Sequence, residues 1–431
     1  MREKGAGVLS FAAFCVFLWE RIHDCKSNTY QNMKTKSLLL TLVCAILCAF
    51  HAVAAEGYAV YTASNHTLTF YYGTKPDGAY SLNAYNEMPE WYYAGIYAAV
   101  TRVVFDSSFA QAHPISTIYW FYKMENLTTI SNWNYLNTSI VIKMKYMFSG
   151  CKKLTNINLS GFNTSKVIDM SYMFEDCDAI TTLDLNKLNT SNVTQMIGMF
   201  YGCSGLTSLN LSKFNTSKVT NMANMFRMCD KLTSLDLSGF NTSNVTDMAH
   251  MFDGCAQLKN VNLSSFNTSK VTSMIGMFQD CPKLTSLELG SYNTSKVTDM
   301  TWMFYNCQNL KTVKVSDAWS TAAVTISEDM FDLCKSIVGG AGTTYKFNHT
   351  DKEYARIDGG PSNPGYFTSS SGGLHGDVNG DGKVNVTDVT TLINMILGVV
   401  PKDETRADIN GDGKINVSDV TALVNIILGI S

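Results

Sequence analysis

The sequence has little charge, and neither sign dominates. Lys, Arg, Asp and Glu make up only 16% of the 431 residues, and the formal net charge is −3. A protein that binds nucleic acid presents a strongly basic surface, because it must neutralise phosphates. We therefore expect no nucleic-acid partner. The length and the 45% hydrophobic content allow two or three domains.

Catalytic motifs are also missing. No HExxH, GxSxG, phosphate-binding loop or CxxC motif occurs after residue 55, and the seven histidines are scattered. No constellation of nucleophile, base and orienting group can be drawn from the remaining residues. We therefore expect no enzymatic activity.

The chain has no apolar run long enough for a membrane-spanning helix, which needs about 20 residues. Residues 38–50 are apolar, follow Lys34 and Lys36, and precede small residues at 52–55. This order predicts a bacterial Sec-type signal peptide over residues 33–55, and hence a secreted or cell-surface protein with no transmembrane span in the mature chain.

Two alternatives to this signal are weaker. A membrane anchor is disfavoured by the short apolar run, and lipid attachment by the bulky residues before Cys44 and Cys48. Residues 1–32 precede a complete signal, so Met33 is the expected start of the native protein. Residues 1–55 are thus assigned to a signal region.

A strict internal repeat fills the middle of the chain. Its clearest mark is a cysteine at an interval of 26 residues, with a last interval of 27: Cys151, Cys177, Cys203, Cys229, Cys255, Cys281, Cys307 and Cys334. Each copy follows the pattern LxxLxLxxFNTSxVxxMxxMFxxC, so every apolar letter forms a column. A single copy cannot bury its apolar edge, whereas stacked copies bury one another. The repeat therefore predicts a solenoid over residues 116–338.

Each repeat is expected to form one coil of an α/β solenoid. The LxxLxL segment alternates like a strand with one face toward the core, and stacked parallel strands lie about 4.8 Å apart. The VxxMxxMFxxC segment has apolar residues three and four positions apart, the spacing of a short α or 3₁₀ helix. With a degenerate first copy at Trp120, about nine coils would form a ladder roughly 40 Å long.

The repeat resembles the 26-residue repeat of BspA-like leucine-rich-repeat proteins of bacterial surfaces. The MFxxC and FNTS elements carry this resemblance over about half of the chain. It implies a secreted or surface-displayed protein for adhesion or protein–protein interaction, without specifying a ligand.

The cysteine column allows two interpretations. Stacked Cα atoms about 4.8 Å apart are within the range that a disulfide tolerates. However, one cysteine per coil at a constant core position, with Met124 in its place in the first copy, fits a small buried hydrophobe. We therefore favour free buried thiols over a disulfide framework.

A column of asparagines is expected at a turn. There the amide side chain can satisfy backbone groups of its own coil and of adjacent coils. Glycosylation at the Asn-Thr-Ser sequence is the disfavoured alternative, because a repeated turn explains every copy. The column consists of Asn163, Asn189, Asn215, Asn241, Asn267 and Asn293.

The segments on either side of the repeats differ from them in composition. Residues 56–115 are rich in aromatics and predict an N-terminal cap, with a hairpin formed by residues 58–62 and 67–72. Alternatively, exposed aromatics there bind a sugar or a protein partner. Residues 339–367 predict a C-terminal cap, and the Ser- and Gly-rich residues 368–375 predict a flexible linker.

Two acidic loops, 31 residues apart, follow the linker. Side-chain oxygens stand at loop positions 1, 3, 5 and 12, position 7 offers a backbone carbonyl, and position 9 offers an amide that binds directly or through water. This pattern is typical of calcium sites, so we expect two Ca²⁺ ions. The expected ligands are Asp377, Asn379, Asp381, Lys383, Asn385 and Asp388 in the first loop and Asp408, Asn410, Asp412, Lys414, Asn416 and Asp419 in the second.

Each loop leads directly into an amphipathic segment, residues 386–397 or 417–428. Half an EF-hand, duplicated and ending in Asp, resembles a type I dockerin over residues 376–431. The resemblance implies a small all-α domain that folds with calcium and is captured by a cohesin module. Dockerins are commonly attached to glycan-degrading enzymes, so a component of polysaccharide catabolism associated with glycoside hydrolases is the alternative function.

The outward strand positions of the repeats are small and polar. Thr233, Ser234 and Asp236 are examples, and the large anchors Trp, Tyr and Arg that dominate tight interfaces are missing from these positions. We therefore expect weak or multivalent contact with an unknown protein or glycan, through the repeats or the N-terminal cap. Adhesion or protein interaction is the first functional hypothesis, and carbohydrate binding within a dockerin–cohesin assembly is the second.

Overall fold

The computed structural model describes residues 55–83, 86–370, 375–381, 383–410 and 412–430. Contacts divide the chain into Met1–Ala55 and Glu56–Ser431. Apart from Ala55, the predicted signal peptide and residues 1–32 lie outside the described residues. Within the described part, no helix has the length and apolar character needed to cross a membrane.

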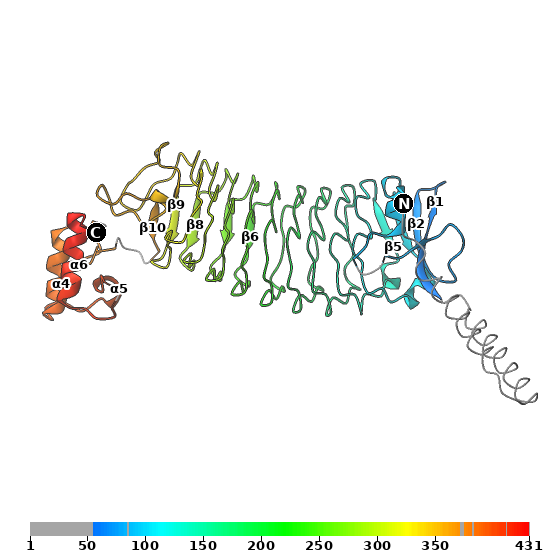
Figure 1. Ribbon diagram of the computed structural model, residues 1–431, viewed down its shortest axis with the longest axis horizontal. Helices are drawn as coiled ribbons and strands as arrows, with labels where there is room; N and C mark the ends of the chain where they lie inside the picture. The colour runs from blue at the N-terminus through cyan, green and yellow to red at the C-terminus, as the bar shows by residue number, and fades with distance from the viewer. Residues whose placement is uncertain (1–54, 84–85, 371–374, 382, 411, 431) are drawn as a thin grey trace, which may run out of the picture. The chain divides into compact units, whose positions relative to one another are not determined.

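The N-terminal part of the described chain forms a five-stranded mixed sheet, in the order β3-β1-β2-β4-β5 (Figure 1). β1 and β2 pair antiparallel, from Glu56 opposite Gly73 to Thr62 opposite Thr67, which confirms the predicted hairpin. β2 runs parallel to β4, and β4 to β5, so the hairpin continues into a parallel ladder. The strands are β1 (Glu56–Thr62), β2 (Thr67–Gly73), β3 (Tyr80–Ser81), β4 (Arg102–Phe105) and β5 (Thr129–Ser131).

Many of the N-terminal aromatics are core residues. The Phe70 ring contacts those of Trp91, Phe105, Phe109 and Trp120, with centroids 5.0–5.5 Å apart. The buried Trp91 indole donates to the Trp120 carbonyl at 2.9 Å, so its N–H is satisfied. These rings cover the first coil, as expected of a cap. The short helices here are α3 (Glu90–Tyr93), η1 (Ile96–Ala98), η2 (Ser107–Gln111) and η3 (Trp133–Tyr135).

The repeats stack as parallel coils. Parallel bridges join equivalent residues of successive coils, from the pair Ser116 and Lys143 to the pair Asp299 and Ile326. In β8 the side chains alternate between exposed and buried, which confirms in this coil the strand predicted for LxxLxL. The strands are short, and β6 pairs parallel to β7 and β8 to β9. They are β6 (Ser234–Asp236), β7 (Asn260–Asn262), β8 (Ser286–Leu289) and β9 (Thr312–Val315).

The second half of the coil is a series of turns, so the predicted short helix is wrong. In one coil His250 and Gly254 have left-handed backbones, with φ of 54° and 73°, which interrupt any helix. Along this segment, backbone N–H groups donate in turn to a carbonyl of the same coil and to a carbonyl of the next coil. Cys255 N donates to Phe252 O of its own coil at 3.1 Å, whereas Phe252 N donates to Met277 O of the next coil at 3.0 Å. The same apolar spacing therefore serves a turn that also pairs with its neighbour.

Phenylalanine and cysteine columns form the centre of the ladder. The rings stack face to face from Phe148 to Phe331, with centroids 5.4–5.8 Å apart and interplanar angles of at most 16°. The predicted burial of the cysteine column is confirmed, and the eight cysteines of the described residues are free thiols. Cys255 Sγ donates to the Phe226 carbonyl of the preceding coil at 3.1 Å.

Threonines of the FNTS segment join neighbouring coils. The buried Thr242 hydroxyl bonds to both backbone groups of Asn267 in the next coil, and the side chain of Asn267 accepts from Ser269 N of its own coil at 3.0 Å. The asparagine column therefore acts within its own coil, as predicted, but threonine makes the expected contact between coils. The threonines with this pair of bonds are Thr138, Thr164, Thr190, Thr216, Thr242 and Thr268.

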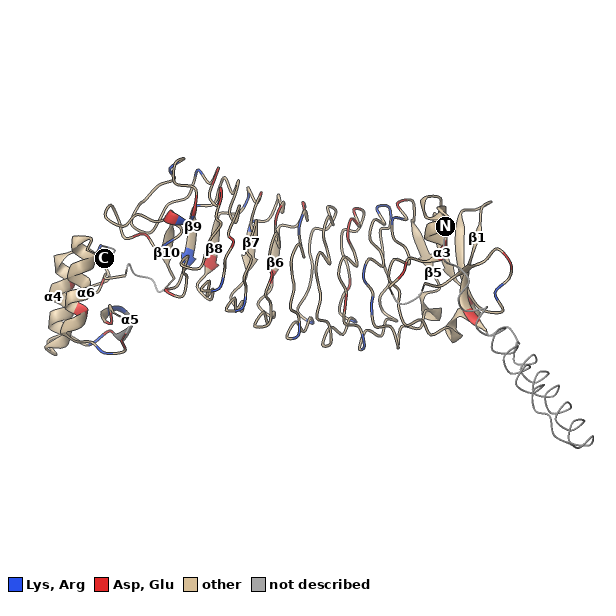
Figure 2. Cartoon of the chain, viewed as in Figure 1, with Lys and Arg blue, Asp and Glu red and all other residues tan. Residues whose placement is uncertain are grey.

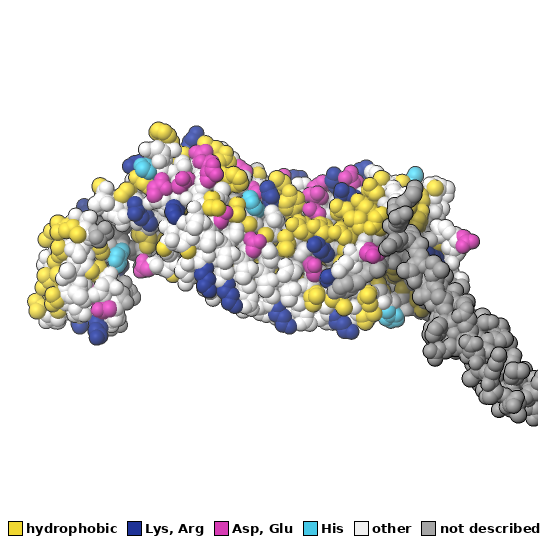
Figure 3. Space-filling model, viewed as in Figure 1, with side chains coloured by type: hydrophobic (Ala, Val, Ile, Leu, Met, Phe, Trp, Pro, Cys, Tyr) yellow, Lys and Arg dark blue, Asp and Glu magenta, His cyan; other side chains and the backbone are white. Residues whose placement is uncertain are grey.

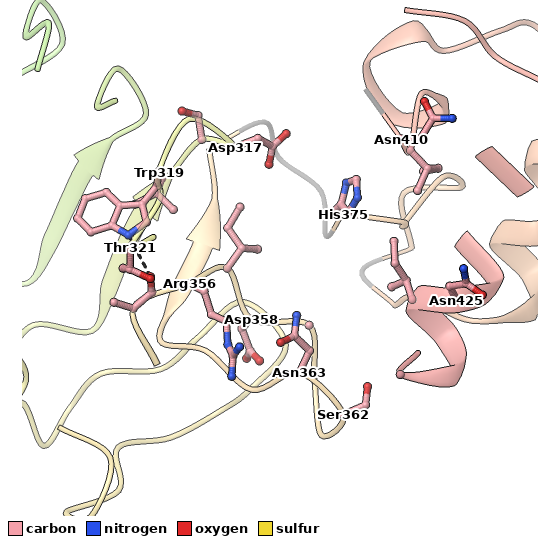
Figure 4. Close-up of a pocket in the computed structure, with 18 of the residues that line it drawn as sticks. Asp317, Trp319, Thr321, Arg356, Asp358, Ser362, Asn363, His375, Asn410 and Asn425 are labelled. Atoms are coloured by element: carbon pink, nitrogen blue, oxygen red, sulfur yellow. Dashed lines mark hydrogen bonds between the residues drawn. The ribbon is translucent and has the colours of Figure 1, made fainter. Parts of the chain in front are cut away.

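A compact segment closes the C-terminal end of the ladder. Its strand β10 (Phe367–Ser369) pairs parallel to β9, and η4 (Lys352–Tyr354) precedes it. Asp358 is fully buried and organises the segment, because its carboxylate accepts from four backbone N–H groups and the Thr343 hydroxyl. Trp319 Nε1 donates to the Ala355 carbonyl at 3.0 Å, the bond drawn in Figure 4.

The acidic loops and the helices that follow them have their own hydrophobic core, built around Leu392 and Leu423. The helices are α4 (Val386–Ile396), α5 (Glu404–Ala407) and α6 (Val417–Leu428). The amphipathic segments predicted at 386–397 and 417–428 are thereby confirmed as helices. Their buried faces meet in this core, which also contains Val378, Met395, Ala407 and Ile409.

Candidate functional site

The first acidic loop begins with side-chain oxygens that accept from the loop's own backbone. Asp377 Oδ1 accepts from Gly380 N at 2.8 Å and from Asp381 N at 3.0 Å. Asn379 Oδ1 also accepts from Asp381 N at 2.8 Å, and Asp381 Oδ1 accepts from Lys383 N at 2.9 Å. The side chains at positions 1, 3 and 5 are therefore held around a single tight turn.

Asp388, at position 12, closes the loop and caps α4. Its Oδ1 accepts from Asn379 N at 3.1 Å and its Oδ2 from Asn385 N at 2.9 Å. Asn385 Oδ1 accepts from Thr387 N at 2.8 Å, which completes a capping box at the start of the helix. The two ends of the loop are thus brought together by one buried carboxylate, and the position 9 amide serves as the helix N-cap.

The second loop repeats this arrangement. Asp408 accepts from Asp412 N at 3.1 Å, and Asp419 accepts from Asn410 N at 3.2 Å and from Asn416 N at 2.8 Å. Asn416 and Asp419 form the capping box of α6. Gly413 at position 6 has φ of 78°, the left-handed turn for which a glycine is needed there.

The donor set has the chemistry that a hard cation requires. Each loop supplies three carboxylates, two amide oxygens and a backbone carbonyl at Lys383 or Lys414, and oxygen ligands of this kind bind calcium. Asp377, Asp388 and Asp419 are at most 2% exposed, a burial that carboxylates tolerate only when paired, hydrogen-bonded or bound to metal. Here each of these carboxylates accepts from backbone N–H groups of its own loop. Over the described residues, no three His, Cys, Asp or Glu side chains converge closely enough to hold a metal ion.

The two helices expose matching apolar side chains. Val386 and Val417 begin their helices at 70% and 69% exposure, and Leu397 and Leu428 stand at the other ends at 70% and 63%. Figure 3 shows hydrophobic side chains on the surface of this part of the chain. Exposed apolar groups repeated at equivalent positions are typical of an interaction surface.

Hydroxyl groups beside these valines connect the apolar surface to the loops. Asn379 Nδ2 donates to Thr387 Oγ1 at 2.9 Å, and Asn410 Nδ2 donates to Ser418 Oγ at 2.7 Å. A predicted calcium ligand thus contacts a side chain of the exposed surface in each half. The state of each loop can therefore influence the surface next to it.

Sequence reasoning did not find several residues that position these features. The buried threonines, the left-handed turn residues and Asp358 were all missed. The turn residues had a usable signal, because Gly, Asn, Asp and His recur at two positions four residues apart, as at His250 and Gly254. The strand positions Ser234 and Asp236 are exposed as expected.

Two families match the chain. The family described as "Mycoplasma protein of unknown function, DUF285" matches residues 115–234 and 221–341, and the "Dockerin type I domain" matches residues 375–428. Both are non-catalytic modules. No curated protein matches the chain significantly.

Solved structures with similarity to the chain include bacterial leucine-rich-repeat proteins. The Treponema pallidum leucine-rich-repeat protein is 17% identical over 52% of this chain and 86% of that one, with a TM-score of 0.29. A leucine-rich cell surface protein from Faecalibacterium prausnitzii is 17% identical over 65% and 91%, with a TM-score of 0.24. A leucine-rich-repeat protein from Eubacterium ventriosum is 15% identical over 65% and 95%, with a TM-score of 0.22.

The family matches confirm the resemblance that the FNTS and MFxxC elements and the twin acidic loops indicate. Because the repeat family covers more than half of the residues, the chain belongs to the DUF285 family of BspA-like repeat proteins and carries a type I dockerin domain at its C-terminal end.

Proposed function

We propose that this protein is a secreted or surface-displayed interaction protein that binds a partner through its stacked repeats and is held by a cohesin through its dockerin. The duplicated loop and helix carry the second part of this proposal. Both loops end in a buried aspartate that caps a helix, and both helices begin with an exposed valine. Two equivalent surfaces of this kind suit capture by a single partner module.

Calcium is the proposed cofactor, with one ion in each loop. Asp377, Asn379, Asp381 and Asp388 would hold the first ion, with the Lys383 carbonyl and with Asn385 directly or through water. Asp408, Asn410, Asp412, Asp419, the Lys414 carbonyl and Asn416 would hold the second. Residues 376–431 contain eight acidic residues and four basic ones, so a bound cation would supply positive charge where negative charge predominates. Without it, the clustered carboxylates repel one another.

Binding of the full chain to an immobilised type I cohesin tests this proposal. We expect capture in calcium and its loss in EDTA, because the ion holds the two ends of each loop together. The double variant Asp388→Ala and Asp419→Ala should lose capture in calcium as well. Lys383→Ala is the matched control, since only its backbone carbonyl is a proposed ligand. Equal capture with and without calcium would contradict the proposal.

Export of the protein is proposed from its N-terminal sequence, with residues 33–55 as the signal. Supporting this signal, a basic segment, an apolar segment and small residues follow one another before Glu56. N-terminal sequencing of the secreted protein should begin at Ala55 or Glu56. A precursor that starts before Met33 would show that residues 1–32 are native. The linker predicted at 368–375 begins later than expected, because Thr368 and Ser369 belong to β10 and pair with β9.

A further inference from the structure

Two positions of the coil vary between copies where the rest of the repeat is nearly constant. They are the second residue after the first methionine and the second residue before the cysteine of VxxMxxMFxxC. The first position holds an aromatic ring in five coils, glycine in two and Asn224 or Asp329 in two others. The rings are Tyr119, Tyr146, Tyr172, His250 and Trp302. We call these two columns of residues the turn face. In stacked repeats, positions that vary on a constant scaffold are where binding specificity can reside.

The aromatic residues of the turn face have a backbone conformation that disfavours them. Their φ angles lie between 54° and 61°, in the left-handed region where a bulky side chain is strained. Gly198 and Gly276 occupy the same position with φ of 55° and 54°. The coil therefore forms with glycine, the residue best suited to this conformation. Strained bulky residues at a site that accepts glycine indicate a role other than folding.

Stacking offsets this strain in the first coils only. Tyr146 lies between Tyr119 and Tyr172, with centroids 5.0 Å and 4.8 Å away and nearly parallel rings. Trp302 is different, because none of the ring contacts found among the described residues involves it and 39% of its surface is exposed. A strained and partly exposed tryptophan is typical of a binding residue.

The second column of the turn face contains an ordered ion pair, in which Asp253 is buried and Arg227 is partly exposed. Arg227 Nε lies 2.8 Å from Asp253 Oδ2, and His250 Nδ1 lies 3.1 Å from the same oxygen. The Arg227 guanidinium also stands over the Tyr201 ring, 5.7 Å from its centroid. Arg, Tyr and Trp are the residues most enriched at the energetic centres of protein interfaces. Their geometry here is set before any partner arrives.

The shape of the turn face favours a protein over a glycan or a small molecule. A sugar ring packs on an open aromatic face, but the faces of the stacked tyrosines cover one another, and the uncovered Trp302 ring lies five coils beyond Tyr172. Beside them, in the described structure, lies a hollow of about 240 Å³ lined by residues such as Tyr122 and Glu175, less than most small-molecule sites enclose. Figure 3 shows hydrophobic side chains gathered over the N-terminal coils.

We propose that the turn face, and not the polar strand face, binds a protein partner, with Trp302 and the stacked tyrosines as anchors. This inference rests on the proposed function and specifies where and what the repeats bind. The partner contacts several coils at once, because the anchors are distributed from Tyr119 to Trp302. Its surface is apolar, with an acceptor group opposite the partly exposed Arg227 guanidinium, because Asp253 is buried and presents no charge of its own.

Glycine substitutions separate binding from folding. Trp302→Gly and Tyr146→Gly place in the coil the residue that Gly198 and Gly276 already supply, so neither should unfold the protein. The full chain, in calcium, is applied to an array of purified extracellular and cell-surface proteins and to a glycan array. For the wild-type protein we expect binding on the protein array, weakened at least about tenfold by either glycine variant. The exposed Lys187→Ala should bind like the wild type.

The stability and cohesin measurements make the outcome decisive. Trp302→Gly should still melt in one cooperative transition, at a somewhat lower temperature than the wild type, because relief of strain offsets only part of the burial that the indole loses. Unchanged binding by both glycine variants, binding on the glycan array alone, or binding on neither array would overturn the proposal. Cohesin capture, measured on the same preparations, reports separately on the dockerin and should be the same for every variant.

Discussion

The Thr242 hydroxyl donates to the Asn267 carbonyl at 2.9 Å and accepts from the Asn267 N–H at 2.8 Å, so one side chain satisfies both backbone groups of a residue in the next coil. Thr242 is fully buried, and water cannot replace these bonds. The repeated FNTS sequence is therefore a joint between coils as well as a turn.

Thr242→Val should lower the free energy of unfolding by about 2 kcal/mol, because it leaves the Asn267 N–H and C=O buried and unpaired. Valine keeps the shape of threonine, so packing is nearly unchanged. Thr246→Val is the control, since its exposed hydroxyl makes a single bond to Thr220 O at 3.2 Å, and it should cost less than about 0.5 kcal/mol. Urea denaturation measures both. Equal losses of stability in the two variants would show that the pair of hydrogen bonds at Thr242 stabilises the protein no more than the single bond at Thr246.

Tyr292→Phe should stabilise the protein by about 1 kcal/mol. Its ring continues the column of Phe266, but its buried hydroxyl has no hydrogen-bond partner among the described residues. Phenylalanine removes the unpaired group and keeps the ring. Tyr366→Phe should have the opposite effect, because the Tyr366 hydroxyl accepts from Lys346 N and donates to His349 O. Thermal unfolding of both variants checks the sign, and a loss of stability in Tyr292→Phe would refute the prediction.

The cysteine column predicts a loss of stability in alkali. Burial raises the pKa of Cys203, Cys255 and Cys307 to about 12, from an ordinary value of 9.0. A thiol whose pKa is raised by folding contributes stability that is complete below pH 9.0 and falls progressively from there toward pH 12. Ionisation of each thiol in the unfolded chain therefore lowers the free energy of unfolding by up to about 1.4 kcal/mol per pH unit between pH 9.0 and pH 12.

Cys255→Ala isolates this effect. Between pH 7 and pH 11 the free energy of unfolding should fall less steeply for the variant than for the wild type. The difference corresponds to the contribution of one thiol. A thiol reagent should modify the native protein slowly and the denatured protein rapidly, since the thiols are buried. Identical pH dependences for the two proteins would contradict the assignment.

Asp358→Asn should lower the free energy of unfolding of the C-terminal segment by about 3 kcal/mol. The asparagine amide would present N–H groups to the N–H groups that the carboxylate now accepts from, including those of Ala341 and Gly360. Hydrogen exchange should accelerate over β10 first. Asp317→Asn, on an exposed turn, should leave exchange unchanged. Wild-type protection of β10 in Asp358→Asn would count against this role.

Chelation should separate the two parts of the protein. EDTA should remove the circular dichroism signal of α4 and α6, because the carboxylates that cap these helices then repel without a cation. The signal of the stacked coils and their melting temperature should remain, since they have a separate core. A helical signal that survives EDTA would show that hydrogen bonds such as Asp388 to Asn385 N suffice to fold the domain.

Features that a local sequence pattern determines could be predicted from the sequence. The Phe and Cys columns, the strand at Ser286–Leu289 and the hairpin of β1 and β2 follow from apolar spacing and turn residues. The same holds for the helices that begin at Val386 and Val417. Local pattern determines each of these features, so no knowledge of distant contacts was needed.

Features that depend on distant contacts could not be predicted in this way. Methionines three residues apart suit a helix as well as a turn, and the choice was made by bonds such as Phe252 N to Met277 O in the next coil. Asp358 looks like any surface aspartate in the sequence, because its partners at Ala341 and Thr343 come from another part of the cap. Calcium binding by Asp377 and its neighbours stays a prediction.

The bonds between coils also determine how the protein would respond to tension. A dockerin held by a cohesin would fix the chain beyond its C-terminal cap, and a force applied at the N-terminal cap would pull on the other end of the ladder. Every coil then carries the full load in series, and the weakest joint between coils sets the force at which the ladder opens. The threonine bond between coils recurs with nearly the same length, 2.9 Å at Thr242, 3.0 Å at Thr216 and 2.8 Å at Thr268, so it contributes alike at each of these junctions.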